Sequence, residues 1–241
     1  MDYLIFQLQA PLSAWGDTAV GEYRPTANYP SESALLGLLA AALGIKREDE
    51  TAHQALREGY GFAVGVQSAG YLLRDYHTAQ VPGHSDLKNR PHHTRRDELN
   101  MSKEKLNTIL STRDYRQDAA CLVAVQASDN APYLLSDLSQ ALQKPRYVLY
   151  LGRKACPPAL PLWPQVVAVN NALEAMEQYR NLLTELAGDL AVVPLERLVW
   201  GTGITAGCDE YIQVVRKDRL LSREHWQFGD RQEHVAFLEG H

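Results

Sequence analysis

Four cations and two tyrosines lie close together between residues 144 and 154. This segment reads Lys-Pro-Arg-Tyr-Val-Leu-Tyr-Leu-Gly-Arg-Lys. Cations neutralise phosphates, tyrosine rings stack on bases, and a glycine lets a backbone approach a ligand closely. These residue types predict a surface that holds RNA. The candidate residues are Lys144, Arg146, Tyr147, Tyr150, Gly152, Arg153 and Lys154.

The cations of this segment contrast with the rest of the chain, whose formal net charge is −5. No acidic residue occurs between Asp137 and Glu174, so the sequence offers the cations no nearby partner. From composition alone the alternative is a strand and a turn with solvated cations, because runs of charge usually form solvated faces.

The loop predicted over residues 11–30 is a second candidate surface. It shows no hydrophobic period and is rich in Gly, Pro, Ser, Thr and Asn. Its aromatic residues and its arginine offer a stacking platform for bases. Trp15 is explained equally well as an anchor that packs the loop on the core. The candidates are Trp15, Gly16, Arg24 and Tyr29.

Histidines raise the alternative of catalysis. Metal-independent RNA cleavage needs a base for the 2′-hydroxyl and an acid for the leaving oxygen, and His77 or His92 is the candidate base.

A metal site is not expected, because the adjacent His92 and His93 would point in opposite directions on a strand and no carboxylate has a matching spacing. A G-x-S-x-G elbow and a P-loop are both absent, so neither a serine hydrolase nor a nucleotide site is predicted, and no cofactor is expected.

The elements that must position these residues follow a mixed pattern. Helices are predicted over 31–43, between a Ser31 cap and a Gly44 stop, and over 48–58, 134–143 and 172–186. Strands are predicted over 3–9, 62–66, 71–76 (pairing with 62–66), 121–126, 147–151, 166–169, 195–199, 211–216 and 235–238. The order of the first two thirds predicts an α+β protein with a ferredoxin-like sandwich. Its central strands carry only Phe6 as an aromatic residue, so any RNA is expected on loops and not on the sheet face.

A projecting arm is predicted over residues 77–115, because the pattern fails after Tyr76 and such a long loop is uncommon without a function. A short helix is expected at 102–110. Prolines at positions 157, 158, 161 and 164 mark a boundary between a domain over 1–156 and a smaller α+β domain over 157–241. The candidate contact residues of the arm are Arg74, Tyr76, His77, Lys88, Arg90, Arg95 and Arg96.

The chain has no run of apolar residues long enough to span a membrane and no basic segment typical of a signal peptide. Its three cysteines are odd in number and widely spaced, which argues against a disulfide framework. A cytoplasmic protein is therefore expected.

Four motifs occur in order: residues 9–16 (QAPLSAWG), 24–39 (RPT through PSESALLGLL), 73–78 (LRDYHT) and 144–153 (KPRY through LGR). Together they resemble the CasD family, the subunit of type I-E CRISPR Cascade that binds the 5′ handle of the crRNA. The last third of the chain matches only loosely.

The resemblance implies a RAMP protein with a ferredoxin-like fold that caps one end of the Cascade backbone. It implies that the loop of Trp15 and the 144–154 segment grip the crRNA 5′ handle. The arm would be a thumb that reaches the backbone subunit, with the large PAM-reading subunit and the target DNA nearby. In type I-E complexes another subunit cleaves the precursor, so the resemblance implies no catalysis. A sister branch in type I-C does cleave precursor RNA with Tyr, Lys and His, which keeps the endoribonuclease alternative open.

Overall fold

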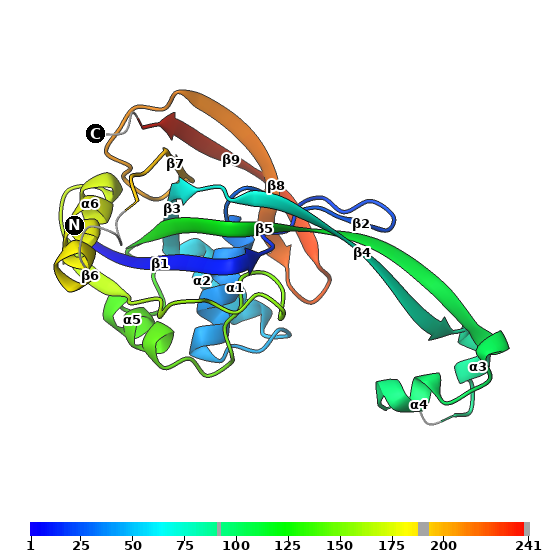
Figure 1. Cartoon of the computed structure of the whole chain (residues 1–241). Coiled ribbons are helices and arrows are strands. Elements are labelled where there is room, and N and C mark those ends of the chain that lie inside the picture. Colours follow the sequence, from blue (N-terminus) through cyan, green and yellow to red (C-terminus); the bar gives the residue numbers. More distant parts are fainter. Residues whose placement is uncertain (91–92, 188–192, 239–241) are drawn as a thin grey trace.

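The computed structural model describes residues 1–90, 93–187 and 193–238, which form a sheet-rich α/β body with a long projecting arm (Figure 1). The strands are β1 (Asp2–Ser13), β2 (Tyr23–Arg24), β3 (Tyr60–Ser68), β4 (Tyr71–Pro82), β5 (Leu106–Ala127), β6 (Gln165–Ala168), β7 (Arg197–Trp200), β8 (Ile212–Ser222) and β9 (Gln227–Phe237). The helices are α1 (Glu32–Leu43), α2 (Glu50–Gly59), α3 (His84–Leu87), α4 (Arg95–Leu99), α5 (Leu135–Gln143) and α6 (Ala172–Ala187), with a 3-10 turn at Lys103–Lys105. The four predicted helices and most predicted strands are confirmed, several with longer bounds.

One sheet organises the body, with the strand order β6-β1-β5-β3-β7-β9-β8 and antiparallel neighbours throughout. The strands that follow residue 157 join this sheet at two places, since β6 pairs with β1 and β7 pairs with β3. The sheet therefore runs across the boundary expected near residue 157, and the division into domains over 1–156 and 157–241 stays a prediction.

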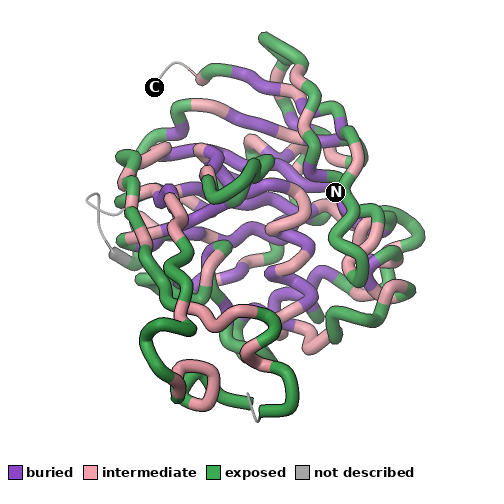
Figure 2. The backbone as a smooth tube through the Cα atoms, turned by 90° about the vertical axis from the view of Figure 1, so that its right-hand side faces the viewer, coloured by how far each residue is buried: buried purple, intermediate pink, exposed green. Residues whose placement is uncertain are grey.

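Helices cover both faces of the sheet at β1. Leu4, Phe6 and Leu8 belong to the core that includes α1 and α5, whereas Tyr3 and Ile5 belong to the core that includes α6. This division follows from the two-residue period of a strand. Figure 2 shows the buried residues concentrated in the body and the arm exposed. Phe6 is fully buried, so the sheet face at β1 presents no platform for RNA.

Helix α1 forms where its caps predict it. The Ser31 Oγ accepts a hydrogen bond from the Ala34 N–H at 3.2 Å, and Gly44 ends the helix with φ +80°, a left-handed conformation that glycine adopts without strain. Leucines at several faces of the helix are buried, as its apolar sequence predicts. Helix α1 therefore provides a rigid surface against which other segments pack.

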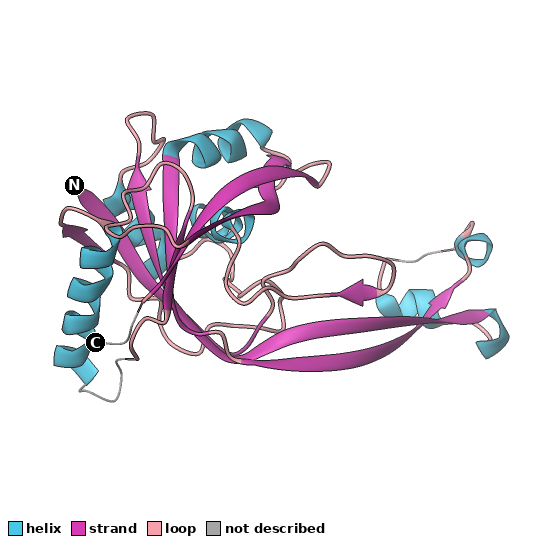
Figure 3. Ribbon diagram, turned by 90° about the horizontal axis from the view of Figure 1, so that it is seen from above, coloured by secondary structure: helices cyan, strands magenta, loops and turns pink. Residues whose placement is uncertain are grey.

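The arm is a two-stranded ribbon, and its prediction as a loop was wrong. Strand β4 pairs with β5 from Tyr71–Gln117 to Pro82–Leu106. The predicted pairing of residues 71–76 with 62–66, which belong to β3, was therefore wrong. The helix predicted at 102–110 was also wrong, because a 3-10 turn leads directly into β5. At about 3.3 Å per residue, the 12 residues of β4 extend about 40 Å. Figure 3 shows the long paired strands of the ribbon.

Residues 11–30 are less irregular than predicted, because β1 continues to Ser13 and β2 pairs in parallel with β5. No helix in the described part of the chain combines the length and the apolar composition that crossing a membrane requires.

Candidate nucleic-acid interface

Residues 144–154, called the basic segment below, run from the end of α5 across the C-terminus of α1. The N–H groups of Arg146 and Tyr147 donate to the carbonyls of Ala42 and Ala41, at 3.0 and 3.1 Å. These carbonyls belong to the last turn of α1, where the regular i→i−4 hydrogen bonds end, and the Ala41 carbonyl also accepts from the Gly44 N–H at 3.2 Å. The segment is therefore held by the end of a helix, and the strand predicted over 147–151 was wrong.

The far end of the basic segment is fixed to the loop that follows β1. The Ala14 N–H donates to the Leu151 carbonyl at 3.0 Å. Gly152 has φ +86°, and a Cβ added there would lie 1.6 Å from the Ala14 carbonyl oxygen. Gly152 thus allows the close approach of two segments of this chain. Buried Leu149 anchors the segment between these two attachments.

The four cations of the basic segment differ in their surroundings. Lys144, Arg146 and Lys154 are exposed and form no ion pair within the described residues. Arg153 is half-buried: it donates to the Asp114 carbonyl at 3.0 Å and to the Arg24 carbonyl at 3.2 Å. Its guanidinium also lies 4.6 Å from the centre of the Tyr115 ring. Arg153 therefore joins the segment to the base of the arm.

The tyrosines of the basic segment present their rings to solvent. Tyr147 is 47% exposed and Tyr150 is 39% exposed, while buried Leu149 and Leu151 point into the core. Residues 148–151 alternate between solvent and core, which explains the strand pattern in the sequence. Exposed rings beside unpaired cations are the combination that single-stranded nucleic acids need.

The candidates in the loop after β1 are placed differently from one another. Gly16 and Arg24 are exposed, and the Arg24 guanidinium donates to the carbonyls of Gly21 and Tyr23. Trp15 is only 7% exposed and belongs to the core, so it anchors the loop. Tyr29 is buried too, and its hydroxyl donates to Glu233 at 2.6 Å. Burial and that carboxylate raise the pKa of Tyr29, which has no exposed ring face for a base.

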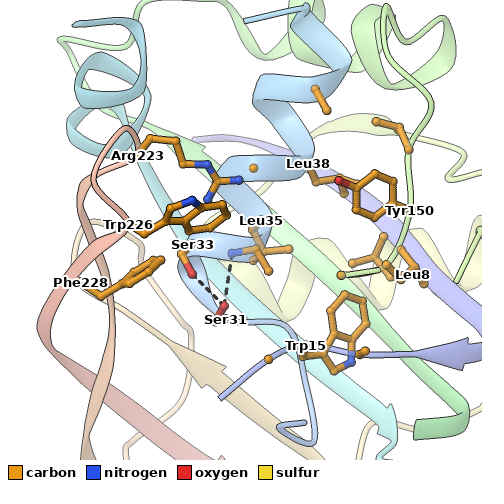
Figure 4. Close-up of a pocket in the computed structure, with 18 of the residues that line it drawn as sticks. Leu8, Trp15, Ser31, Ser33, Leu35, Leu38, Tyr150, Arg223, Trp226 and Phe228 are labelled. Atoms are coloured by element: carbon orange, nitrogen blue, oxygen red, sulfur yellow. Dashed lines mark hydrogen bonds between the residues drawn. The ribbon is translucent and has the colours of Figure 1, made fainter. Parts of the chain in front are cut away.

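A cavity of about 250 Å³ lies between the basic segment, α1 and the β8–β9 hairpin (Figure 4). Tyr150 and Gly152 line one side, and Trp15 and Leu38 line the floor. The hairpin contributes residues that the sequence reading did not select: Arg223, Trp226 and Phe228. They lie at least 69 positions after the end of the basic segment, and no short motif links the two.

A buried charge cluster holds this hairpin against the start of α1. The Arg231 guanidinium donates to both carboxylate oxygens of Asp218 at 2.9 Å and to Glu233 at 2.6 Å, and it lies 3.5 Å from Glu32. Asp218 also accepts the Glu32 N–H at 3.1 Å. The Arg231 side chain is 7% exposed. This group (Arg231, Asp218, Glu233 and Glu32), called the Arg231 cluster below, fixes one wall of the cavity.

The base of the arm is fixed by a second polar group around Asp114. Its carboxylate accepts hydrogen bonds from the Arg74 Nε at 2.9 Å and from the Tyr23 hydroxyl at 2.5 Å. The Arg74 guanidinium, then the Tyr23 hydroxyl, hold the pKa of Asp114 below its usual value against the opposing effect of burial. Arg74 therefore stabilises the root of the ribbon.

Asp114→Asn is expected to loosen that root. A neutral amide loses one charge-assisted partner, worth about 1 kcal/mol, which corresponds to roughly a fivefold rise in local opening. Hydrogen exchange of amides over residues 71–76 measures it. Asp75→Asn is the matched control, because the exposed Asp75–His77 pair should contribute almost nothing. Equal effects of the two substitutions would contradict this role for Asp114.

The other arm candidates lie on the ribbon or at its tip. Tyr76 is 63% exposed on β4. At the tip, Arg90 donates to the Asn100 carbonyl at 2.5 Å, and Arg95 donates to Glu98 at 2.6 Å. Lys88 and Arg96 are exposed there. Arg90 and Arg95 thus stabilise the tip through hydrogen bonds, and Lys88 and Arg96 add positive charge to its surface.

The geometry of the arm gives little support to a catalytic pair. Tyr76 and His77 are neighbours on a strand, so their side chains point to opposite faces of the ribbon. The His77 imidazole lies against Asp75. His92, the other candidate base, lies outside the described residues. Over the ranges that the structure describes, no group of three His, Cys, Asp or Glu residues is arranged to hold a metal ion.

Comparison with known proteins defines the class of this chain. Residues 3–233 match the family model described as CRISPR-associated protein (Cas_Cas5). The chain belongs to the Cas5 family of CRISPR-associated proteins.

Within that family, the chain is similar to the CRISPR system Cascade subunit CasD of Escherichia coli (strain K12). The two are 36% identical over 187 residues, which cover 73% of this chain and 76% of the relative. This confirms the resemblance that the four motifs indicate.

Two solved structures share the fold. One chain of a CRISPR RNA-guided surveillance complex matches with a TM-score of 0.67 and 25% identity, over 99% of this chain and 90% of that one. A crystal structure of a Cas protein matches with a TM-score of 0.61 and 22% identity, over 99% and 95% of the two chains.

Proposed function

We propose that this chain is a non-catalytic subunit of a type I-E Cascade complex, in which it binds the crRNA 5′ handle and caps the backbone. The relation to CasD supports the assignment to such a complex. The observation that carries the RNA-binding role is the basic segment: Lys144, Arg146 and Lys154 have no acidic partner among the described residues and lie beside two exposed tyrosines. A segment fixed at both ends binds with a smaller loss of conformational entropy than a mobile loop.

The ferredoxin-like RAMP fold is part of this proposal. The elements β1, α1, β3, β5, α5 and β6 follow the β-α-β-β-α-β order of that fold. They assemble as β6-β1-β5-β3, with the first and third strands in the centre. The later strands β7, β9 and β8 extend this sheet beyond β3.

The arm is proposed to contact the neighbouring backbone subunit. A ribbon of about 40 Å, exposed along its length, can reach a partner that the body does not touch. The large PAM-reading subunit would dock nearby, close to the target DNA. The chain would thus share the binding of the RNA with its partners. This explains how a protein with a net charge of −5 can be part of an RNA-binding complex, because it does not bind the RNA alone.

Removing exposed cations of the basic segment should flatten the salt dependence of RNA binding. For single strands, each phosphate contact contributes a slope of about 0.7 in log K against log[salt], so Arg146→Ala and Lys154→Ala should each lower the slope by about that amount. Fluorescence anisotropy with a labelled handle RNA at several salt concentrations measures it. Lys217→Ala, an exposed cation on β8, is the control. Unchanged slopes for both variants would refute the assigned surface.

A lack of catalysis has a direct test. Repeat RNA incubated with the purified chain in EDTA is expected to remain intact. A single specific cut that disappears in His77→Ala would instead establish the endoribonuclease.

A further inference from the structure

The cavity beside the basic segment has walls suited to a flat aromatic ligand. Tyr150 forms one side, and Trp226 and Phe228 form the opposite side, above the buried surface of α1 (Figure 4). The exposed fractions of Tyr150, Trp226 and Phe228 are 39%, 52% and 40%. Its volume of about 250 Å³ is below the roughly 300–1,000 Å³ of sites for drug-sized ligands. The space therefore suits a single ring system.

Trp226 is held in place by two guanidinium groups. Arg47 lies 4.2 Å and Arg223 lies 4.8 Å from the centre of the indole ring. Trp226 also has φ +52°, a left-handed conformation that bulky residues seldom adopt. Such a conformation persists where the surroundings impose it, often at a binding site. The hairpin turn thus holds a partly exposed indole at the cavity wall.

Arg223 brings an available cation to the same wall. Within the described residues its guanidinium makes no hydrogen bond, although it is half-buried. Its Nη2 lies 3.0 Å from the place of a Cβ on Gly37, in the middle of α1. A glycine inside a helix costs about 1 kcal/mol relative to alanine, and the guanidinium explains why the smaller residue suits this position. Burial and the nearby Arg47 lower the pKa of Arg223, because both disfavour its charged form. An anion or an acceptor oxygen beside the guanidinium would stabilise that charged form.

Two hydroxyl groups complete the polar lining. Ser31 and Ser33 line the cavity, with their Oγ atoms 3.1 Å apart. Hydroxyls both donate and accept, so they can meet the edge of a nucleobase. Proteins recognise single-stranded RNA by unstacking a base and placing it between aromatic rings and guanidinium planes.

We propose that this cavity binds one unstacked nucleobase of the RNA held by the basic segment, between Tyr150 and Trp226, with Arg223 donating to the base edge or to its phosphate. The inference rests on the proposed function and extends it to a part of the surface formed by the β8–β9 hairpin. The charge of the surroundings favours RNA as the occupant, because Arg47, Arg223 and Arg146 lie on the segments around the cavity.

The test is an abasic scan with the full chain. Labelled handle RNA, and versions that lack one base at a time, are titrated by fluorescence anisotropy. For the wild type, one abasic position is expected to weaken binding on the order of tenfold, the effect of losing a stacked base. In Trp226→Ala the intact RNA should bind as weakly as that abasic RNA, and the abasic position should no longer matter.

Two further variants keep the test independent of one substitution. Arg223→Ala should weaken binding several-fold. Gly37→Ala places a methyl group 3.0 Å from the Arg223 Nη2, so the guanidinium must shift, while the substitution favours the helix. It should also weaken binding. Phe237→Ala, an exposed aromatic residue at the other end of β9, is the matched control and should change nothing.

The outcomes separate the two proposals. If the wild type binds none of the RNAs, the proposed function fails and the base pocket fails with it. If the wild type binds but no abasic position is coupled to Trp226, only the base pocket is overturned. Loss of complex assembly with unchanged RNA affinity would overturn it as well, in favour of a protein side chain as the occupant.

Discussion

Replacing Arg231 by methionine is expected to lower the free energy of unfolding by about 3–5 kcal/mol. The substitution keeps a long side chain but removes the cation that Asp218, Glu233 and Glu32 share. Three carboxylates then lie close together with little access to water, and the loss of a buried partner is more costly than the net value of the pair. Urea denaturation followed by circular dichroism measures the change.

The deficit of Arg231→Met should depend on pH with a definite sign. Burial raises the pKa of Glu32 even in the wild type, and Arg231 opposes that rise. Without the cation, folding raises the pKa of Glu32 further above its unfolded value. Relative to the wild type, the variant is therefore least destabilised at a pH below the unfolded pKa of Glu32. Its relative stability falls as the pH rises through the folded pKa of that carboxyl. Its deficit should therefore be largest near pH 7 and smaller near pH 5.

Lys217→Met is the matched control, since Lys217 is an exposed cation on the same hairpin. Surface substitutions of this kind usually change stability by less than about 0.5 kcal/mol. A loss below about 1 kcal/mol for Arg231→Met, or a deficit that does not change with pH, would contradict the role of the Arg231 cluster.

Gly152→Ala is the second substitution with a large expected effect. A left-handed conformation costs a residue with a Cβ about 1–2 kcal/mol, and here the Cβ would also lie 1.6 Å from the Ala14 carbonyl oxygen. Because that atom belongs to the backbone, the basic segment must move, and the Ala14–Leu151 hydrogen bond is worth about another 1 kcal/mol. We expect a total loss of about 2–4 kcal/mol, with weaker RNA binding because the tyrosines are displaced.

Gly16→Ala separates the clash from the backbone strain. Gly16 also has a positive φ, of +68°, yet a Cβ added there meets nothing within 4 Å. It should therefore lose only the 1–2 kcal/mol of the left-handed conformation. Urea titrations of the two variants give the difference directly. Equal losses would show that the contact with Ala14 does not hold the segment.

Local signals in the sequence predicted the body of the protein well. Helix α1 follows from Ser31, a run of leucines and Gly44, all of which act within the helix itself. The central strands follow from alternating apolar residues, because one face of each strand is buried against helices.

The sequence predictions that the structure contradicts were wrong for physical reasons. The arm has no core to bury, so residues 77–82 of β4 and 106–120 of β5 lack the apolar alternation that identifies a strand in sequence. Residues 148–151 do alternate between exposed and buried positions, but no strand pairs with them: Tyr147 bonds to the end of α1, and Leu151 bonds to Ala14 and Cys156. Arg231 and Glu233 lie outside the strand predicted over 235–238, whereas in the structure both belong to β9, are buried and pair with each other.

The candidate site was predicted in part. The resemblance implied that the basic segment and the loop of Trp15 both grip the RNA, and in the structure the Ala14–Leu151 hydrogen bond joins these two segments. The hairpin that completes the cavity could not be found, because only the packing of β8 and β9 on α1 places Trp226 opposite Tyr150. The hydrogen bond from the Arg153 guanidinium to the backbone carbonyl of Asp114 could not be predicted either, because the two residues are distant in the sequence.

Ultraviolet crosslinking of the assembled complex to its crRNA, with mass spectrometry of the adducts, tests the central claim most directly. The proposed interface predicts RNA adducts on Tyr147, Tyr150 and Trp226. Adducts confined to exposed aromatic residues elsewhere, such as Tyr211 and Phe237, would contradict it.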